Sequence, residues 1–409
     1  MPSHEGPVAS FYKFRRLIAV FQYVQCRRTV KPVQRGEKAV MKKRRVLLVA
    51  GGTGGHIYPA VTLAGELASI LGKSRVVFAA DRRPLAGKVI GGSGFRLFRV
   101  TSEPLPRKEV WHMSRFMIKI ARGIIESALL LARYRPAAVV AFGAYTSVPV
   151  VIAAYVLRIP VIIHEQNGFP GLANKFLARF ADKVAISFTA SSQYFPKNKT
   201  VLTGNPVRSE LLAADKDEAV KYFKLDPGKI TVFVFGGSLG SLSINMNLMG
   251  ILPYMEDYRD RVQFIHLCGD KSYEQVLSEY ADRGFTARVF RYLDRMDYAY
   301  AAADIVVARA GATTIAEITA LGKPSILIPF PGATSQHQAL NAKPLCNIGG
   351  ALCYPDELFS GEGLAVRLIP LINDSAGRKK ISDSLQGLSE RFTGAAERLA
   401  SIVMGYCDV

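Results

Sequence analysis

Short, mostly apolar runs recur along this chain, and each is followed by a turn and a helical pattern. Residues 46–50 (VLLVA) form the first run, and residues 76–80, 137–142 and 160–164 form the next three. Runs with so few polar positions are typical of strands buried on both faces. The alternation of such strands with helices predicts a parallel sheet covered by helices on both sides.

The pattern restarts in the second half of the chain. After a charged stretch, residues 230–235 (ITVFVF) open a new series, and both series begin with a strand, a glycine-rich turn and a helix. We therefore expect two Rossmann-like domains that face each other. The boundaries that we assign are a basic extension at residues 1–40, a first domain at 41–208, a second domain at 209–375, and a C-terminal helical segment at 376–409 that packs back on the first domain.

Composition narrows the classes of function. A chain of 409 residues with 49% hydrophobic and 21% charged residues is globular and suits about two domains. Its 53 Lys and Arg against 33 Asp and Glu give a net charge of +20, which favours an anionic partner. Because no zinc-finger spacing and no RNA-binding strand pattern occurs, we expect no nucleic acid. Phosphorylated substrates or an anionic membrane face are favoured instead.

The cysteines and the N-terminus add two expectations. The five cysteines are scattered and lack CxxC spacing, so we expect buried free thiols in a reducing compartment, with no disulfide framework and no zinc site. Residues 1–40 hold one apolar run, 17–24, too short to span a membrane and without a cleavage site. This extension is either a basic amphipathic anchor or foreign to the natural protein, and the second reading is favoured because Met41 precedes the first strand.

The first glycine-rich turn, residues 51–56 (GGTGGH), lies between a strand and a helix. Glycine lets backbone N–H groups approach a ligand, and a helix N-terminus attracts anions. The spacing matches neither the dinucleotide fingerprint nor the P-loop. His56 follows the glycines, where it could act as a general base or phosphate contact, or only as a capping or packing residue.

Two further loops follow strands of the first domain. Residues 142–149 (FGAYTSVP) could form a second anion-binding turn or a plain loop. The string HEQN at 164–167 ends an apolar strand, and consecutive polar residues there are costly unless they line a site or bond to one another. Because ligands bind beyond the carboxyl ends of parallel strands, Glu165 or Asn167 could contact sugar hydroxyls or the reacting centre.

The second domain carries the matching elements. Its glycine turn at 236–240 (GGSLG) offers a seat for a diphosphate, with Ser238 as a hydroxyl donor. Glu317 lies early in a helix, where its carboxylate could accept from a ribose diol or serve in a capping box. Arg208, near the domain boundary, could reach a phosphate or remain solvated. Amide contacts to a sugar could come from Gln336, Gln338 and Asn341.

No metal site is evident. The one DxD triplet, at residues 215–217, lies in the charged boundary stretch rather than at a strand end. We therefore expect the charge of a leaving diphosphate to be met by backbone N–H groups, helix dipoles and Arg208.

A basic, apolar stretch at residues 104–122 favours contact with a membrane. It carries Trp111, Phe116 and Met117 among several Lys and Arg residues. Apolar side chains can enter the headgroup region while cations meet anionic lipids. The alternative is a core helix with a solvated basic face.

With these motifs identified, the chain from Arg45 to its C-terminus resembles the MurG family. The shared strings are GGTGGHIYPA, FGAYTSVP, HEQNGFPGLANKFLARFADKVA, TGNPVR, GGSLGSLSIN, ARAGATTIAE and HQALNA. The resemblance implies the α/β glycosyltransferase-B fold, with two Rossmann-like domains, parallel sheets and an interdomain cleft. It also implies inverting transfer of GlcNAc from UDP-GlcNAc to the MurNAc C4 hydroxyl of undecaprenyl-diphospho-MurNAc-pentapeptide, converting lipid I to lipid II in peptidoglycan synthesis.

The resemblance assigns roles to particular residues. His56 is the implied base, with Glu165 as its rival, and an acceptor diphosphate would lie at Gly143, Ala144 and Tyr145. Ala144 departs from the family, which usually has glycine there. Implied membrane contacts are Trp111, Phe116, Met117 and Lys119. Implied donor contacts are Thr53, Gly54, Gly55, Asn167, Arg208, Ser238, Leu293, Ala312, Thr313, Thr314, Ile315, Ala316, Glu317 and Gln338.

Neither a cofactor nor a metal is implied. The implied location is peripheral, on the cytoplasmic face of the inner membrane, whose anionic surface is a partner, and other cell-wall synthesis proteins are possible partners. Three alternatives remain open from the residues. They are a transferase that makes other glycolipids, a non-catalytic nucleotide-sugar-binding subunit, and a sugar-nucleotide epimerase of the same fold.

Overall fold

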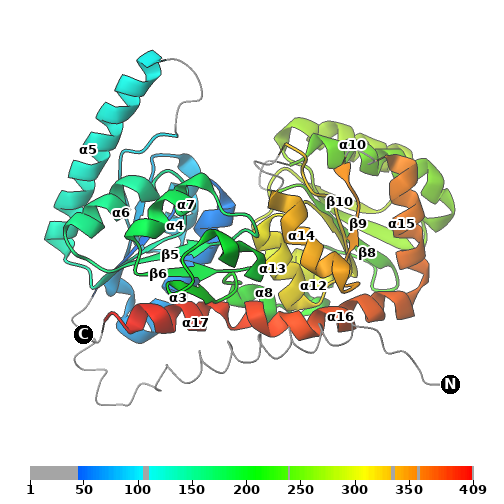
Figure 1. Ribbon diagram of the computed structural model, residues 1–409. Helices are drawn as coiled ribbons and strands as arrows, with labels where there is room; N and C mark the ends of the chain where they lie inside the picture. The colour runs from blue at the N-terminus through cyan, green and yellow to red at the C-terminus, as the bar shows by residue number, and fades with distance from the viewer. Residues whose placement is uncertain (1–44, 105–109, 238–239, 333–336, 357–359, 408–409) are drawn as a thin grey trace, which may run out of the picture. The chain divides into compact units, whose positions relative to one another are not determined.

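The computed structural model describes residues 45–104, 110–237, 240–332, 337–356 and 360–407 (Figure 1). Seven parallel strands form a first sheet in the order β3-β2-β1-β4-β5-β6-β7. They are β1 (Val46–Val49), β2 (Val76–Ala80), β3 (Arg96–Arg99), β4 (Ala138–Ala141), β5 (Val161–Glu165), β6 (Lys183–Ile186) and β7 (Thr200–Leu202). The strand order reverses between β1 and β4, so the loops after these two strands are neighbours at the carboxyl edge.

Helices cover both faces of this sheet (Figure 1). They are α3 (Gly54–Leu71), α4 (Pro84–Gly92), α5 (Val110–Tyr134), α6 (Ser147–Val156) and α7 (Leu172–Leu177), with short 3₁₀ turns η1 (Lys73–Arg75), η2 (Ala178–Phe180) and η3 (Thr189–Tyr194). The central strands are fully buried, as their apolar runs predict, whereas the edge strand β3 is half-exposed. Its sequence, RLFR, has only two apolar residues between two arginines, so it does not form an apolar run.

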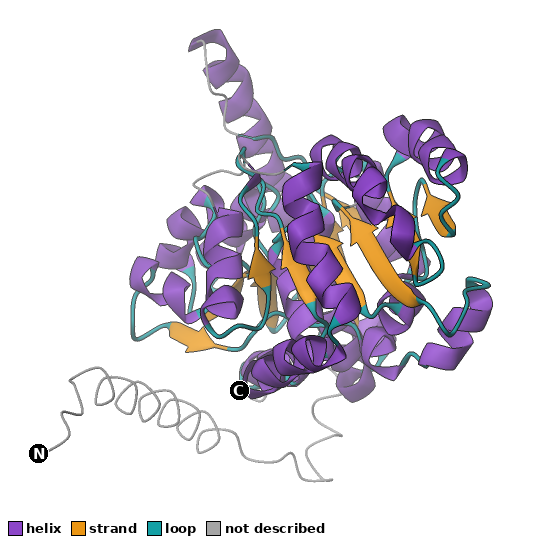
Figure 2. Cartoon of the chain, turned by 90° about the vertical axis from the view of Figure 1, so that its right-hand side faces the viewer, coloured by secondary structure: helices purple, strands orange, loops and turns teal. Residues whose placement is uncertain are grey.

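A second sheet of six parallel strands follows in the order β10-β9-β8-β11-β12-β13. Figure 2 shows helices on both sides of its strands. The strands are β8 (Ile230–Phe235), β9 (Val262–Leu267), β10 (Ala287–Phe290), β11 (Ile305–Ala308), β12 (Ser325–Leu327) and β13 (Leu352–Cys353). The helical elements are α8 (Ser209–Ala213), α9 (Lys216–Tyr222), α10 (Leu242–Ile251), η4 (Leu252–Tyr258), η5 (Asp270–Ser272), α11 (Tyr273–Asp282), α12 (Met296–Ala302), α13 (Ala312–Leu321), α14 (His337–Asn347) and α15 (Gly361–Asn373).

Two C-terminal helices connect the halves of the chain. α16 (Ser375–Thr393) packs against α13 of the second half, and α17 (Ala395–Met404) packs against α3 of the first. The two helices run in succession along both halves (Figure 1). Two parallel sheets, each covered by helices, confirm the α/β fold class expected from the sequence.

The cysteines depart from expectation. Cys346, at the end of α14, and Cys353, in β13, form a disulfide with Cα atoms 6.0 Å apart. The prediction of free thiols is wrong for this pair, because α14 folds back onto the edge of the sheet and brings together two positions that sequence spacing alone did not associate. Cys268 is a free, buried thiol, and Cys407 is buried as well.

His266 is a buried polar residue in the middle of the second core. It lies in β9, with Nε2 3.1 Å from Asn245 Oδ1 and Nδ1 3.3 Å from the Tyr280 hydroxyl. Burial lowers the pKa of His266 to about 3. The folded protein therefore keeps this ring neutral, whereas the unfolded chain binds a proton near the ordinary histidine value.

We expect acid to destabilise the fold through this residue. Between the unfolded pKa of about 6.5 and the folded one, each unit fall in pH lowers the free energy of unfolding by up to about 1.4 kcal/mol per histidine. Urea unfolding of wild type and His266→Asn between about pH 7 and pH 5 measures this slope. The variant, which cannot titrate there, should show a shallower loss. Parallel slopes would contradict the assignment.

Candidate active site

The first glycine-rich turn connects β1 to α3 and leaves no room for a side chain at Gly51. A Cβ on Gly51 would lie 2.5 Å from Thr146 Oγ1 and 2.8 Å from Asp81 Oδ2. Gly52 has a φ of +81°, and its N–H donates to Asp81 Oδ2 at 3.0 Å. The same oxygen accepts from Thr146 Oγ1 at 3.3 Å. The Asp81 carboxylate therefore holds the turn in place.

The loop after β4 lies beside this turn, as the strand order predicts. Gly143 and Ala144 have φ angles of +90° and +61°. A Cβ on Gly52 would lie 3.3 Å from the Ala144 Cβ. Ala144 thus adopts the left-handed conformation that favours glycine, so the departure from the family pattern leaves the loop shape possible at a cost in backbone strain. The Tyr145 side chain is exposed.

His56 lies on the first turn of α3, next to both loops. Its Nδ1 is 3.0 Å from Gln166 Oε1, at the end of β5. Burial lowers the pKa of His56, with bonding to Gln166 as a smaller opposing effect. The ring is therefore neutral near pH 7, as a general base must be.

Glu165 is buried at the end of β5, and its carboxylate is fully engaged. Oε1 accepts from the backbone N–H and side-chain amide of Asn167, at 2.9 and 3.1 Å. Oε2 accepts from Gly171 N at 3.2 Å and from Asn174 Nδ2 at 2.8 Å. Burial raises the pKa of this carboxyl while these bonds oppose the rise. The arrangement is that of an anchor for the loop from Glu165 to Asn174.

The first turns of α3 and α13 meet. Thr313 Oγ1, at the start of α13, donates to the Gly55 carbonyl oxygen at 3.5 Å. Thr53, Gly54 and Gly55 on one side therefore lie close to the start of α13 on the other. Free N–H groups at two helix N-termini give this place a positive potential suited to phosphate.

Glu317 belongs to a buried polar cluster farther along α13. Its Oε1 accepts from Arg208 Nη2 at 3.0 Å, and its Oε2 accepts from the Tyr300 hydroxyl at 3.0 Å. The Arg208 guanidinium also lies 4.7 Å from the centre of the Tyr58 ring in α3. The structure thus brings together Arg208 and Glu317, two residues that were each predicted to contact the donor. No side chain caps the N-terminus of α13, so Glu317 does not form a capping box.

The second glycine-rich turn also excludes side chains. A Cβ on Gly236 would collide with Ser241, and one on Gly240 would collide with the Cys268 carbonyl. Ser241 caps α10 through Ile244 N. Ser238, the predicted hydroxyl donor, lies outside the described residues.

Arg309 holds the second glycine-rich turn in place through Ser241, and the sequence analysis did not identify it. It is buried, and it donates to Ser241 Oγ at 3.0 Å and to the Ile328 carbonyl at 3.2 Å. It also pairs with Asp356. A buried arginine that follows an apolar strand was the available signal.

The remaining donor predictions fall on the same edge of the second sheet. Leu293 is buried in the loop after β10, and Gln338 Oε1 accepts from Phe330 N at 2.9 Å. Asn341, expected to contact a sugar, is instead fully buried. Its Oδ1 accepts from Gly168 N at 2.8 Å, and its Nδ2 is 3.3 Å from Asn167 Oδ1. Asn341 therefore joins the two halves in this structure, and its contact with a sugar stays a prediction.

The predicted membrane contacts lie on α5. Met117 is 58% exposed and Phe116 is partly buried. Lys119 pairs with Glu103 at 2.6 Å. Trp111 lies in the helix, but its side chain is outside the described residues. Gln336 falls outside them as well.

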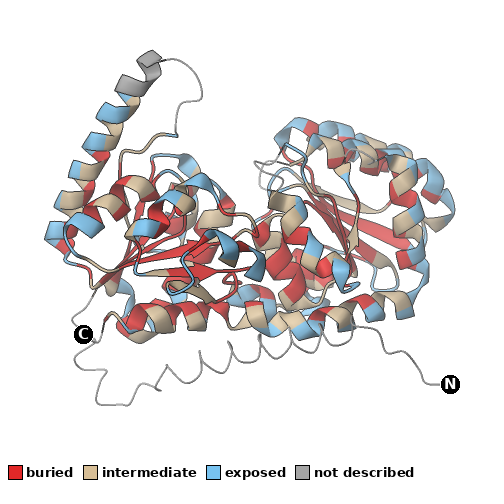
Figure 3. Cartoon of the chain, viewed as in Figure 1, coloured by how far each residue is buried: buried red, intermediate tan, exposed pale blue. Residues whose placement is uncertain are grey.

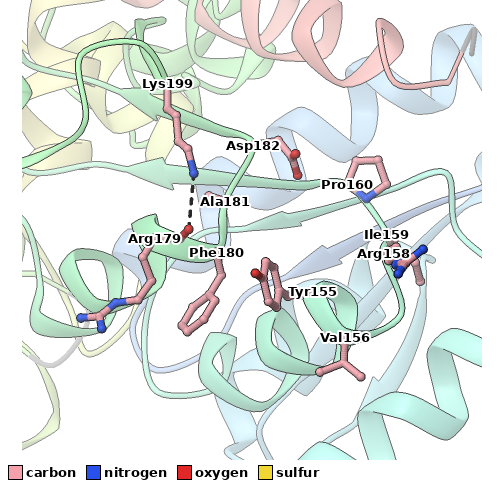
Figure 4. A pocket seen from close by; sticks show the side chains of 10 residues that line it. All are labelled: Tyr155, Val156, Arg158, Ile159, Pro160, Arg179, Phe180, Ala181, Asp182 and Lys199. Carbon is pink, nitrogen blue, oxygen red and sulfur yellow. Dashed lines mark hydrogen bonds between the residues drawn. The ribbon is translucent and has the colours of Figure 1, made fainter.

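A pocket of about 520 Å³ lies away from this site, at the amino ends of β5, β6 and β7 (Figure 4). It is lined by Tyr155, Val156, Arg158, Ile159, Pro160, Arg179, Phe180, Ala181, Asp182 and Lys199. Its position opposite the glycine turns separates it from the candidate active site. In the described part of the chain, no three His, Cys, Asp or Glu side chains converge as metal ligands would.

Comparison with known proteins places these residues in a family. Residues 46–186 match the glycosyltransferase family 28 N-terminal domain, and residues 231–399 match its C-terminal domain. A crystal structure of MurG from Acinetobacter baumannii superposes with a TM-score of 0.67 at 25% identity, covering 88% of this chain and 99% of that one. UDP-GlcNAc 2-epimerase from Neisseria meningitidis, at 15% identity and a TM-score of 0.63, shares the fold.

Curated relatives are closer in sequence. The UDP-N-acetylglucosamine–N-acetylmuramyl-(pentapeptide) pyrophosphoryl-undecaprenol N-acetylglucosamine transferase of Myxococcus xanthus is 39% identical over 358 residues, 88% of this chain and 92% of that protein. The protein of the same name from Thermodesulfovibrio yellowstonii is 36% identical over 350 residues, 86% of this chain and 96% of that protein. The chain belongs to the MurG family of these transferases, within glycosyltransferase family 28.

Proposed function

We propose that this protein transfers GlcNAc from UDP-GlcNAc to the C4 hydroxyl of MurNAc in undecaprenyl-diphospho-MurNAc-pentapeptide, with inversion at the anomeric carbon. The hydroxyl oxygen bonds to C1 of GlcNAc as the bond from C1 to the UDP oxygen breaks, and the hydroxyl proton passes to a base. The observation that carries this proposal is the meeting of the α3 and α13 N-termini, with His56 on the first turn of one helix and Glu317 along the other.

The donor side of this proposal rests on Arg208 and Glu317. Both carboxylate oxygens of Glu317 already have partners, Arg208 on one and Tyr300 on the other. A ribose diol that bonds to Oε1 would take the place of Arg208. The guanidinium would then be free to meet the diphosphate, whose departure needs positive charge.

His56 is the better candidate for the base. A carboxylate that already accepts four hydrogen bonds, as Glu165 does, has little capacity left for a substrate hydroxyl. The bond from His56 to Gln166 uses only Nδ1, and the neutral ring keeps its second nitrogen for proton transfer.

We also propose that α5 docks on an anionic membrane face. Figure 3 shows exposed positions along this helix. Ile118, Ile125 and Leu129 are 69%, 62% and 68% exposed and share one helical face. Exposed arginines at 115, 122 and 133 accompany them. No described helix is long and apolar enough to cross a bilayer. An apolar stripe flanked by cations suits a helix that lies in the interface.

The transfer itself is tested with radiolabelled UDP-GlcNAc and a lipid I analogue. We expect label to move into the lipid only when the analogue is present. Label that appears only in free sugar or in an epimer would exclude transfer. An acceptor lacking MurNAc serves as the control for glycolipid synthesis of another kind.

The two candidate bases are separated by substitution. We expect His56→Ala to lower kcat by about 10²–10⁴-fold, the usual contribution of a general base. Glu165→Gln removes the charge but keeps the shape. We expect this variant to have a lower melting temperature, because the anchor loses its charge-assisted bonds. The pH profile of kcat should change little. Near-wild-type turnover of His56→Ala would move the role to another group.

Membrane docking predicts a specific loss of vesicle binding. We expect Ile118→Asp combined with Ile125→Asp to weaken binding to phosphatidylglycerol vesicles at least about tenfold, since apolar burial is replaced by repulsion. Val366→Asp, at a position 67% exposed on α15, is the matched control and should bind as wild type. Cosedimentation measures both. Equal binding of all three proteins would contradict the assignment to α5.

A further inference from the structure

A continuous row of hydrogen bonds leads from the end of the first sheet to His56. His164 Nε2 is 3.0 Å from the Gly204 carbonyl oxygen. His164 Nδ1 is 3.0 Å from Gln166 Nε2. Gln166 Oε1 is in turn 3.0 Å from His56 Nδ1. Gln166 and His164 are both buried, so water does not compete for these bonds.

The far end of the row fixes its direction. A backbone carbonyl can only accept, so His164 must carry its proton on the Nε2 that faces Gly204. Burial lowers the pKa of His164 to about 4, which keeps the ring neutral. Its Nδ1 is therefore without a proton and accepts from Gln166.

Three acceptors around Nε2 fix the orientation of the Gln166 amide. Its Nε2 faces the unprotonated nitrogen of His164, and it also donates to the Phe142 carbonyl at 3.0 Å and to the His164 carbonyl at 3.2 Å. Two of these three groups can only accept. A flipped amide would place an oxygen against them, at the cost of several buried bonds. Gln166 Oε1 consequently faces His56.

The Gln166 oxygen in turn fixes the protonated nitrogen of His56. An amide oxygen can only accept, so the proton of the neutral His56 ring lies on Nδ1 and Nε2 carries the lone pair. We propose that Gln166 and His164 are positioning residues that fix the tautomer of His56, so that Nε2 receives the proton of the acceptor hydroxyl. This inference rests on the proposed role of His56 as the base.

These hydrogen bonds are needed to select the Nδ1-protonated tautomer, because histidine in water favours the other tautomer, with the proton on Nε2. Without Gln166, the lone pair would lie mostly on the inward-facing nitrogen. Arg83 after β2 and His337 in α14 lie near the ring and lower the pKa of His56 further, and the buried His164 in β5 lies near it as well. Gln166 is the side chain bonded to His56 Nδ1 in the described structure, and the Phe142 carbonyl is a further acceptor near the ring.

The tautomer can be observed directly in the full chain without substrate. Nitrogen-15 labelling of the six histidines and a two-bond proton–nitrogen correlation spectrum at about pH 8 report which ring nitrogen is protonated. Comparison with His56→Ala assigns the signal. We expect the Nδ1-protonated form in wild type and the Nε2-protonated form in Gln166→Met. An Nε2-protonated His56 in wild type would overturn the proposal.

Kinetics supply the second readout. Gln166→Met should lower kcat about 10- to 10²-fold, less than loss of the base itself, with the KM for UDP-GlcNAc little changed. Gln166→Glu keeps an acceptor at Nδ1 and adds charge, so the acid limb of the kcat profile should move up by about one pH unit or more. A residue that only stabilises the fold would not move that limb. Unchanged kcat in Gln166→Met, or an unmoved limb in Gln166→Glu, would overturn the proposal.

Gln263→Met is the matched control. Gln263 is equally buried, lies in β9, and bonds to the Asp226 carbonyl at 2.7 Å and to Thr231 Oγ1 at 3.0 Å. This variant should lose stability while kcat and the His56 tautomer remain those of wild type. If the control lost kcat as Gln166→Met does, general destabilisation would explain both variants. Full turnover of His56→Ala would reject the base, whereas the tautomer measurement would still decide the part played by Gln166.

Discussion

The candidate active site depends on one buried carboxylate. Glu165 is buried at the end of β5, and four N–H groups from Asn167, Gly171 and Asn174 donate to its carboxylate. Those bonds fold the chain after β5 into a tight loop. The same fold turns Gln166 back toward His56 and presents Asn167 and Gly168 to the other half of the molecule. Glu165, the rival candidate for the base, thus also supports the loop that carries Gln166.

The contacts that join the two halves near this loop are polar. Asn341 bonds to Gly168, Thr313 bonds to Gly55, and the Tyr58 and Tyr292 hydroxyls approach to 3.5 Å. The contact between the two tyrosine hydroxyls is exposed and can exchange with water, whereas the Asn341 amide is buried. Interfaces of this sort between domains of one chain ordinarily allow relative motion. The ion pair of Arg208 with Glu317 is polar as well. In the proposed function, a ribose diol replaces Arg208 at Glu317, and a diphosphate replaces Glu317 at Arg208.

The sequence was informative where chemistry is local. Apolar runs predicted the central strands, and the spacing of glycines predicted both turns, because buried strands and left-handed backbone restrict which residues are possible. Roles that depend on distant partners could not be predicted. Asn341 was expected to contact a sugar, yet a loop some 170 residues earlier in the chain uses its amide. Cys346 and Cys353 were expected to be free thiols. Gln166 was not singled out within the HEQN string, because two of its partners, His56 in α3 and Phe142 after β4, are distant in the sequence.

The C-terminal helices bear on how the two halves can move. The chain leaves the first half after β7 and returns through Gly394, between α16 and α17. The two crossings touch, because Arg398 Nε donates to the Thr203 carbonyl at 2.9 Å and a Cβ on Gly204 would collide with the Arg391 carbonyl. The two halves of the chain are therefore joined by two adjacent segments, one after β7 and one at Gly394. Any rotation of one half relative to the other must then bend both links, which touch at Gly204.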